Sequence, residues 1–299
     1  MSSDVEKSVT VIGLGPMGQA MATAFLDQGY AVTLWNRTAS RADALVARGA
    51  VLLPGVEQAL AANELVILSL TDYRAMYEVL GPAAPALAGR VLVNLSSDTP
   101  EQARSAAAWA AEHGATHLTG GITVPPSGIG QAESSTFYSG PRETFEKYRS
   151  VLEVVTGRTD YRGEDPGLAA LFYQLGMVMF WTSMVSYWQA VALAHANGLT
   201  AADILGHATD TANSLPGFFA FYAERLDAGR HTGDVDRLAM GMASVEHVLR
   251  TNADSGVDTA LPAAVAELFR RGMDAGHAAD SFSSLVELMK KGEAQPQLP

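Results

Sequence analysis

The chain has 299 residues, no cysteine and a formal net charge of −12 at pH 7. Its length predicts two domains with large hydrophobic cores. Its acidity argues against nonspecific attraction to nucleic acid or to anionic membranes. The absence of cysteine excludes disulfides and thiolate metal sites. The first residues are polar and show no signal-peptide pattern, so we expect a cytoplasmic protein.

A glycine-rich segment follows the first predicted strand. Residues 8–13 form a β-branched run typical of a buried strand, and a run with a helical pattern begins after Gly18. The segment between them is the G-x-G-x-x-G fingerprint of dinucleotide binding in its strand–turn–helix context. Its glycines allow a tight turn, the approach of a pyrophosphate and close helix packing, and the helix N-terminus attracts phosphate. The predicted cofactor contacts are Gly13, Leu14, Gly15, Pro16, Met17 and Gly18.

The second predicted strand, residues 30–35, ends where the cofactor ribose should lie. An NAD site usually has Asp or Glu at this point to bind the ribose hydroxyls. This chain instead has Asn36 followed by Arg37, Thr38 and, three residues on, Arg41. A guanidinium pairs well with a 2′-phosphate, and Thr38 adds a hydroxyl. The pattern favours NADP(H) over NAD(H), and a solvated strand end with exposed basic residues is the alternative.

Strand and helix patterns continue to alternate through the first half, which predicts a parallel sheet with helices on both faces. The predicted strands are 51–53, 65–69, 91–94, 116–118, 134–138 and 158–161, and the predicted helices are 41–48, 56–62, 73–80, 100–113 and 142–152. Residues 120–130 read as a loop because of their Gly and Pro content. Ligands bind at the carboxyl ends of strands in such sheets. We therefore expect cofactor contacts from Leu70, Thr71, Asn94 and Ser96.

The most apolar stretch lies in the middle of the chain. No Asp, Glu, Lys or Arg occurs between Asp165 and Asp203. A helix over residues 167–197 would be roughly 45 Å long, which is enough to cross a bilayer. Polar residues such as Gln174 and Gln189 and the lack of basic flanks argue against a membrane span. We expect instead a helix that joins domain 1–164 to domain 165–299 and is buried between the subunits of an obligate homodimer.

The second half shows only helical patterns. The predicted helices are 201–213, 215–228, 234–253, 260–275 and 282–291, separated by Pro216, Pro262 and Gly276. A helical domain with a surplus of apolar faces also favours a dimer.

Several motifs in this order resemble those of the imine reductases, within the β-hydroxyacid dehydrogenase superfamily, over nearly the whole chain. They are GLGPMG at 13–18, WNRT at 35–38, VNLSSDTP at 93–100, the loop 121–130, FYSG at 137–140 and DPGLAALFY at 165–173. The resemblance implies an α/β Rossmann domain, an all-α C-terminal domain and a domain-swapped homodimer. It also implies NADPH-dependent hydride transfer to the C=N carbon of cyclic imines, giving chiral amines.

The lysine count supports this resemblance over the parent superfamily. Hydroxyacid dehydrogenases use a lysine on the interdomain helix, but this chain has no lysine between Lys147 and Lys290. A protonated iminium substrate would be repelled by an ammonium and not by a neutral phenol. By alignment on Gly167, Tyr173 takes the place of the polar group at the reacting nitrogen, and the resemblance associates this Tyr type with (S)-selective enzymes. The alternative for Tyr173 is an aromatic core residue.

The remaining candidates form an apolar substrate pocket. They are Ser97, Thr123, Val124, Met177, Phe180, Trp181, Ser214, Phe218, Met240, Met242 and His247. Apolar stripes are usually core, and a lone His on a helix is more often structural. No spacing of His and carboxylates suggests a metal site. Three alternatives stay open: a hydroxyacid or carbonyl oxidoreductase, a reductive aminase, and a nonenzymatic NADP(H)-binding sensor or structural dimer.

Overall fold

The computed structural model describes residues 7–290, which form two compact units. The first unit ends at Met179 and the second begins at Phe180, so the division falls inside the long helix α7 (Gly167–Ala196). Each unit is described by itself below. The division at residues 164 and 165 stays a prediction.

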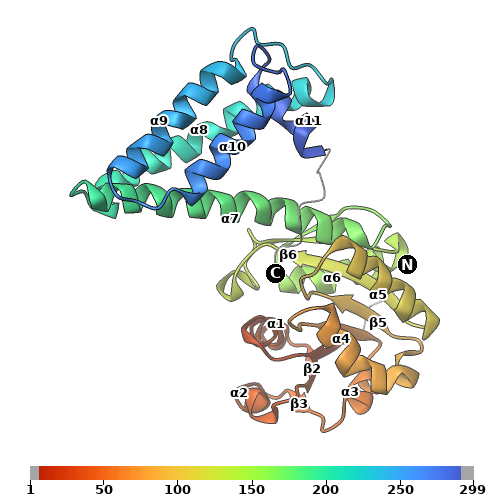
Figure 1. Ribbon diagram of the computed structural model, residues 1–299. Helices are drawn as coiled ribbons and strands as arrows, with labels where there is room; N and C mark the ends of the chain where they lie inside the picture. The colour runs from red at the N-terminus through yellow and green to blue at the C-terminus, as the bar shows by residue number, and fades with distance from the viewer. Residues whose placement is uncertain (1–6, 291–299) are drawn as a thin grey trace. The chain divides into compact units, whose positions relative to one another are not determined.

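The first unit is built on one eight-stranded sheet with the order β3-β2-β1-β4-β5-β6-β7-β8 (Figure 1). The strands are β1 (Ser8–Ile12), β2 (Ala31–Trp35), β3 (Val51–Leu52), β4 (Leu65–Leu68), β5 (Val91–Asn94), β6 (Thr116–Ile122), β7 (Ser135–Ser139) and β8 (Arg158–Tyr161). Neighbouring strands are parallel except β7, which runs antiparallel to β6. The predicted parallel sheet is therefore confirmed with one reversed pair, β6 and β7, which are joined without the crossover helix that a parallel pair needs.

Helices cover both faces of this sheet, and each face has its own hydrophobic core. One core contains Phe25 of α1, Leu45 of α2 and Phe145 of α6. The other contains Leu60 of α3 and side chains of α4 and α5. The bounds are α1 (Pro16–Asp27), η1 (Ala39–Ala42), α2 (Asp43–Val46), α3 (Val56–Ala62), α4 (Tyr73–Leu80), η2 (Gly81–Leu87), α5 (Pro100–Glu112), η3 (Pro126–Gly128) and α6 (Arg142–Val155). Burial on both faces explains why the central strands are almost wholly apolar.

The loop predicted for residues 120–130 begins later than expected, because β6 continues to Ile122. A Cβ on Gly120 would lie 2.2 Å from Leu95 Cδ2, and one on Gly121 would lie 3.0 Å from the Ala169 carbonyl oxygen. These glycines therefore mark places where other groups approach the strand closely. Gly120 and Gly121 are needed for this close packing, which explains why a strand has the composition of a loop here.

The second unit contains α8 (Ala201–Asp227), α9 (Leu238–Asp254), α10 (Ala260–Asp274), η4 (Phe282–Ser284) and α11 (Leu285–Lys290). The predicted break at Pro216 is wrong, since α8 runs through it. Proline removes one backbone hydrogen bond inside a helix, and here more than ten helical residues on each side maintain the helix. The last predicted helix extends one residue further, to Lys291, which lies outside the described residues.

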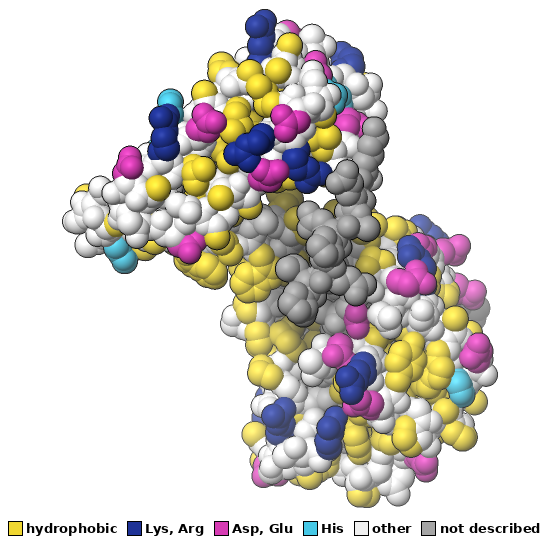
Figure 2. Space-filling model, viewed as in Figure 1, with side chains coloured by type: hydrophobic (Ala, Val, Ile, Leu, Met, Phe, Trp, Pro, Cys, Tyr) yellow, Lys and Arg dark blue, Asp and Glu magenta, His cyan; other side chains and the backbone are white. Residues whose placement is uncertain are grey.

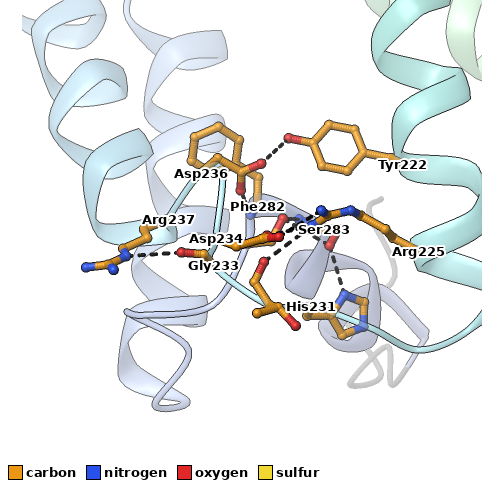
Figure 3. Close-up of polar contacts among 11 residues, drawn as sticks. Tyr222, Arg225, His231, Gly233, Asp234, Asp236, Arg237, Phe282 and Ser283 are labelled. Atoms are coloured by element: carbon orange, nitrogen blue, oxygen red, sulfur yellow. Dashed lines mark hydrogen bonds and ion pairs between the residues drawn. The ribbon is translucent and has the colours of Figure 1, made fainter.

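The helix predicted from Asp234 begins only at Leu238, because the acidic residues before it are used elsewhere (Figure 3). Asp236 accepts hydrogen bonds from the Tyr222 hydroxyl (2.6 Å) and from the Phe282 backbone N–H (2.8 Å). Asp234 pairs with both terminal nitrogens of Arg225. These contacts join α8 to η4 through the segment before α9 and hold residues 234–236 in a turn and a bend, outside the helix.

Helix α7 is long and apolar enough to cross a membrane by length and composition. Within the single chain only 11 % of its most apolar window is buried. Its exposed side chains include Val185 and Trp188, and α8 adds Phe218, Phe219 and Phe221. Figure 2 shows hydrophobic side chains on the surface of the second unit. An exposed apolar surface of this extent is characteristic of an interaction site.

Candidate cofactor and active site

The turn after β1 has the backbone geometry that the glycine fingerprint predicts. Gly13 has a φ of +96°, and a Cβ there would lie 2.2 Å from the Ser69 carbonyl oxygen. A Cβ on Gly18 would lie 1.9 Å from the Gly13 carbonyl oxygen, whereas one on Gly15 would meet nothing within 4 Å. The first and third glycines therefore permit tight packing, and the second faces the open space that a bound pyrophosphate needs.

The N-terminus of α1 has no side-chain cap, although α4 is capped by Asp72 and α5 by Thr99. Pro16 occupies its first turn, and no acidic residue lies there. The uncapped N–H groups and the positive end of the helix dipole suit an anionic phosphate.

Asn36 connects the glycine-rich turn to the loop after β2. Its Oδ1 accepts from the Leu14 N–H (2.9 Å), and its Nδ2 donates to the Thr38 carbonyl oxygen (2.8 Å). Arg37 and Arg41 are exposed, and neither forms an ion pair with another described residue. Asn36 thus orients this loop, while two guanidinium groups stay available for a 2′-phosphate.

The carboxyl ends of β4 and β5 are joined through buried polar groups. The Ser96 hydroxyl accepts from the Leu70 N–H (3.1 Å), and Asn94 Oδ1 accepts from the Ser96 N–H (3.0 Å). Asn94 and Ser96 are nearly inaccessible, whereas Thr71 and Ser97 are exposed. Asn94 and Ser96 therefore shape this edge, and Thr71 and Ser97 present side chains from it.

Tyr173 lies at the same edge of the sheet. In the β5–β6 register Asn94 pairs with Thr119, so Gly121 extends past the carboxyl end of β5. A Cβ on Gly121 would lie 3.0 Å from Tyr173 Cβ, which places this turn of α7 directly against the strand. The next residue, Gln174, donates from Nε2 to the Asp98 carbonyl oxygen (3.2 Å). Tyr173 is half-buried here, at the same carboxyl edge of the sheet from which the glycine-rich turn follows β1.

Three other predicted pocket residues of the first unit lie close in sequence to Gly121 or Tyr173. The Thr123 hydroxyl donates to the Ser135 carbonyl oxygen (2.9 Å), and Val124 packs against the hydrophobic core beside Gly128. Met177 lies one turn after Tyr173 on α7 and is half-buried. These contacts fix the start of the loop after β6.

The predicted pocket residues of the second unit are mostly exposed on three helices. Phe180 and Trp181 are on α7 with their rings edge to face, 5.2 Å between centroids. The others are Ser214 and Phe218 on α8 and Met240, Met242 and His247 on α9, of which Met242 alone is half-buried. Within this unit the Ser214 hydroxyl donates to the Thr211 carbonyl oxygen (2.7 Å).

Sequence reasoning missed the residues that hold the loop after β5. Asp98 accepts from the Tyr73 N–H through Oδ2 (3.2 Å) and from the Thr99 N–H through Oδ1 (2.7 Å), and its carbonyl accepts from Gln174. The sequence offered one signal for this role: Asp98 directly follows Asn-Leu-Ser-Ser, and Asp side chains often accept hydrogen bonds from nearby backbone N–H groups.

The sequence patterns also did not indicate that Arg162 lies close to the aromatic rings of Phe137 and Phe172. The Arg162 guanidinium is 4.0 Å from the Phe172 ring centroid and 4.9 Å from that of Phe137. These contacts link the residue after β8 to β7 and α7, and the Arg162 guanidinium also pairs with Asp160. Among residues 7–290, no group of three or more His or acidic side chains is placed to bind a metal ion.

Comparison with known proteins agrees with this architecture. Residues 8–163 match the family model described as the NAD binding domain of 6-phosphogluconate dehydrogenase, and residues 165–291 match the C-terminal domain described as NADPH-dependent reductive aminase-like. An NADPH-dependent reductive aminase of Aspergillus oryzae is 31 % identical over 294 residues, covering 97 % of this chain and 99 % of that protein.

Two solved structures are more similar in sequence. A Streptomyces aurantiacus imine reductase is 69 % identical with a TM-score of 0.92, covering 94 % of this chain and 99 % of the other. An imine reductase from Bacillus cereus BAG3X2 is 62 % identical with a TM-score of 0.90, covering 95 % and 99 %.

The sheet, the glycine-rich turn and the helical second half together define an NADP(H)-dependent oxidoreductase with a 6-phosphogluconate dehydrogenase-like nucleotide domain. The chain belongs to the imine reductase and reductive aminase family, whose members act on C=N bonds. The predicted Rossmann domain, helical second domain and NADP(H) cofactor are confirmed.

Proposed function

We propose that the chain reduces the C=N carbon of cyclic imines and iminium ions, with Tyr173 as the hydrogen-bond donor at the reacting nitrogen. The observation that carries this proposal is the position of Tyr173 against Gly121, at the carboxyl edge of the sheet. The glycine-rich turn leads from the same edge, so cofactor and phenol belong to one site.

The chain's own residues fit NADP(H). Open space at Gly15 and the uncapped α1 N-terminus suit the pyrophosphate, and Arg37 with Arg41 suits the 2′-phosphate. Leu70, Thr71, Asn94 and Ser96 form the edge on which the rest of the cofactor would lie. When bound, NADPH supplies the hydride.

Tyr173 performs the polar part of the reaction. A neutral phenol donates a hydrogen bond to the imine nitrogen and does not repel an iminium charge. Helix α7 carries no lysine, so no ammonium is available for the proton transfer that an alcohol substrate needs. This favours C=N substrates over hydroxyacids, which are the alternative substrates within the superfamily.

The substitution Tyr173→Phe tests this role. We expect kcat for 2-methyl-1-pyrroline to fall at least roughly tenfold, because a positioned proton donor contributes about that much or more. Binding of NADPH, followed by fluorescence titration, should be unchanged. Tyr30→Phe is the matched control, since Tyr30 immediately precedes β2 at the amino edge of the sheet. Wild-type turnover in Tyr173→Phe would reduce Tyr173 to a packing residue.

The product is expected to be the (S)-amine, as the Tyr-type resemblance implies. Chiral chromatography of the product decides this point, and a racemic or (R) product would contradict it. Reductive amination is a second candidate activity, because the C-terminal half matches a reductive aminase-like domain. Turnover of a ketone with an amine at equimolar concentration would support it, and turnover of preformed imines alone would exclude it.

The apolar pocket residues named from the sequence remain part of this proposal. Ser97, Thr123, Val124 and Met177 would contribute from the first unit. The candidates on the helices of the second unit stay Phe180, Trp181, Ser214, Phe218, Met240, Met242 and His247.

We infer a homodimer in the cytoplasm as the working form. The apolar surface of α7 and α8 supports this assembly, because a water-soluble enzyme needs a partner surface to cover it. A second copy of the chain offers a matching apolar surface under two-fold symmetry. The domain-swapped arrangement and the absence of membrane insertion are part of the same proposal.

A further inference from the structure

The beginning of α7 is held by one ion pair with a two-pronged geometry. Asp165 Oδ1 accepts from Arg104 Nε (2.9 Å) and from the Gly167 N–H (2.9 Å), and Asp165 Oδ2 accepts from Arg104 Nη2 (2.8 Å). Arg104 belongs to α5, so the pair joins α5 to the first turn of α7. Two parallel hydrogen bonds fix direction as well as distance, which a single contact does not.

Gly167 makes this arrangement possible. A Cβ at this position would lie 2.8 Å from Arg104 Cζ and 2.8 Å from Nη2. The guanidinium therefore lies directly over the backbone of Gly167, and a side chain there would displace it. Three groups therefore depend on one another: Gly167, the Asp165 carboxylate and the Arg104 guanidinium.

Three further hydrogen bonds hold the next turns of α7. The Ser139 hydroxyl donates to the Pro166 carbonyl oxygen (2.9 Å) and accepts from the Ala169 N–H (2.9 Å). Gln174 then donates to the Asp98 carbonyl oxygen. These contacts lie on both sides of Tyr173 along the helix, so the position of its hydroxyl follows from where the first turn is held.

Stability alone does not account for the Arg104–Asp165 pair. The two side chains are 44 % and 40 % exposed, and ion pairs with such exposure contribute little to folding. The arginine bond lowers the pKa of Asp165, and the Gly167 N–H lowers it further, so the carboxylate stays charged at neutral pH. We therefore expect the Arg104–Asp165 pair to orient α7, which carries Tyr173, more than it stabilises the fold.

We propose that Arg104 is a positioning residue for C=N reduction: through Asp165 it fixes the first turn of α7 and thereby the place of the Tyr173 hydroxyl. The inference rests on the role proposed for Tyr173. Tyr173 follows Gly167 by six residues, about 9 Å along the helix, so a small tilt at the start displaces the phenol. Catalysis is sensitive to displacements of about 1 Å.

The test compares Arg104→Ala and Arg104→Lys with a matched control. Lys147→Ala removes another half-exposed ion pair of the same unit, with Glu64 at 2.7 Å, which has no hydrogen bond or ion pair with α7 among residues 7–290. For both Arg104 variants we expect kcat for 2-methyl-1-pyrroline at saturating NADPH to fall between about threefold and 100-fold. The dissociation constant for NADPH and the melting temperature should match those of Lys147→Ala. Turnover equal to that of Lys147→Ala would overturn the inference.

The substitution Gly167→Ala tests the positioning role of Arg104 independently. It keeps both charges and places a methyl group where the guanidinium lies. We expect it to lower kcat as Arg104→Lys does, because both keep the charge and lose the two-pronged contact. A wild-type kcat in Gly167→Ala would contradict the proposal.

Coupling to Tyr173 separates positioning from general loss of structure. In the Tyr173→Phe background, Arg104→Ala should have no further effect on kcat, because the group that it positions is gone. Independent, multiplicative losses would overturn the inference. If Tyr173→Phe lowers kcat while Arg104→Ala does not, this inference alone fails. If Tyr173→Phe keeps wild-type turnover, the proposed function of Tyr173 fails first.

Discussion

At the scale of single residues, we propose that Arg37 sets the preference for NADPH over NADH. It is exposed, unpaired among residues 7–290 and placed on a loop that Asn36 orients through bonds to Leu14 and Thr38. A guanidinium distinguishes the two cofactors only through the 2′-phosphate, which NADH lacks.

The substitution Arg37→Ala should therefore weaken NADPH far more than NADH. We expect the dissociation constant for NADPH to rise at least about tenfold, the cost of one charge-assisted hydrogen bond, and that for NADH to change little. Arg149→Ala removes an exposed arginine on α6 as the control. An equal rise in the dissociation constants for NADPH and NADH would show that Arg37 does not bind the 2′-phosphate.

We expect the buried side chain of His117 to make the stability of the protein depend on pH. The residue is buried in β6, and neither ring nitrogen has a hydrogen-bond partner among the described residues. Burial lowers the pKa of His117 from 6.5 to about 4. Below pH 6.5 the unfolded chain takes up a proton that the folded chain refuses, so stability falls as the pH drops towards 4.

The expected size of this effect is about 3 kcal/mol between pH 7 and pH 4. Urea unfolding of His117→Leu over this range should show a pH dependence smaller by that amount. His207→Leu, at an exposed position on α8, should retain the wild-type dependence. The same pH dependence in His117→Leu and wild type would exclude His117 as its source.

At the scale of elements, much of the fold could be predicted from hydrophobic periodicity. Strands β1, β2, β4 and β5 and helix α4 lie where the pattern placed them, because buried parallel strands have continuous apolar runs. The extension of β6 through Gly121 could not be predicted, since its cause is the approach of α7 from a distant part of the sequence.

The start of α9 also depends on partners distant in sequence. Burial alone would raise the pKa of Asp236, but hydrogen bonds from Tyr222 and the Phe282 N–H outweigh it and lower that pKa. Burial and the Asp236 bond raise the pKa of Tyr222 to about 12. This partly buried pair fixes the segment before α9, and the helical pattern alone does not reveal it.

Asp236→Ala should accordingly destabilise the second unit. Two hydrogen bonds to a buried carboxylate are lost, which we expect to cost about 2 kcal/mol or more in the free energy of unfolding. Asp210→Ala, at an exposed position on α8 with no hydrogen bond or ion pair recorded among the described residues, is the control. Chemical denaturation measures both, and equal stabilities would show that the Asp236 contacts contribute nothing.

Candidate site residues could be named from the sequence where a local motif carries them. The glycine turn and Arg37 follow from spacing, and Tyr173 followed from alignment on Gly167 together with the absence of lysine. The contacts of Asp98, Arg104 and Asp165 were not predictable, because they join segments that only the folded sheet brings together.

At the scale of the whole molecule, the apolar surface of α7 and α8 predicts a homodimer. Size-exclusion chromatography with light scattering should give twice the mass of one chain. Trp188→Glu places a charge on this surface, where Trp188 is 51 % exposed, and should produce monomers. Glu246→Gln, on an exposed position of α9, should stay dimeric. A monomeric wild type, or a wild type that floats with liposomes, would contradict the proposed assembly.

The central claim is that the site reduces C=N bonds with NADPH and has no ammonium for alcohol chemistry. Its most direct measurement is the rate of NADPH oxidation by purified protein with a panel of five- to seven-membered cyclic imines, beside the rate of NADP⁺ reduction with β-hydroxyacids. We expect turnover of the imines, including 2-methyl-1-pyrroline, and none of the hydroxyacids. Turnover of hydroxyacids without turnover of any imine would contradict the account.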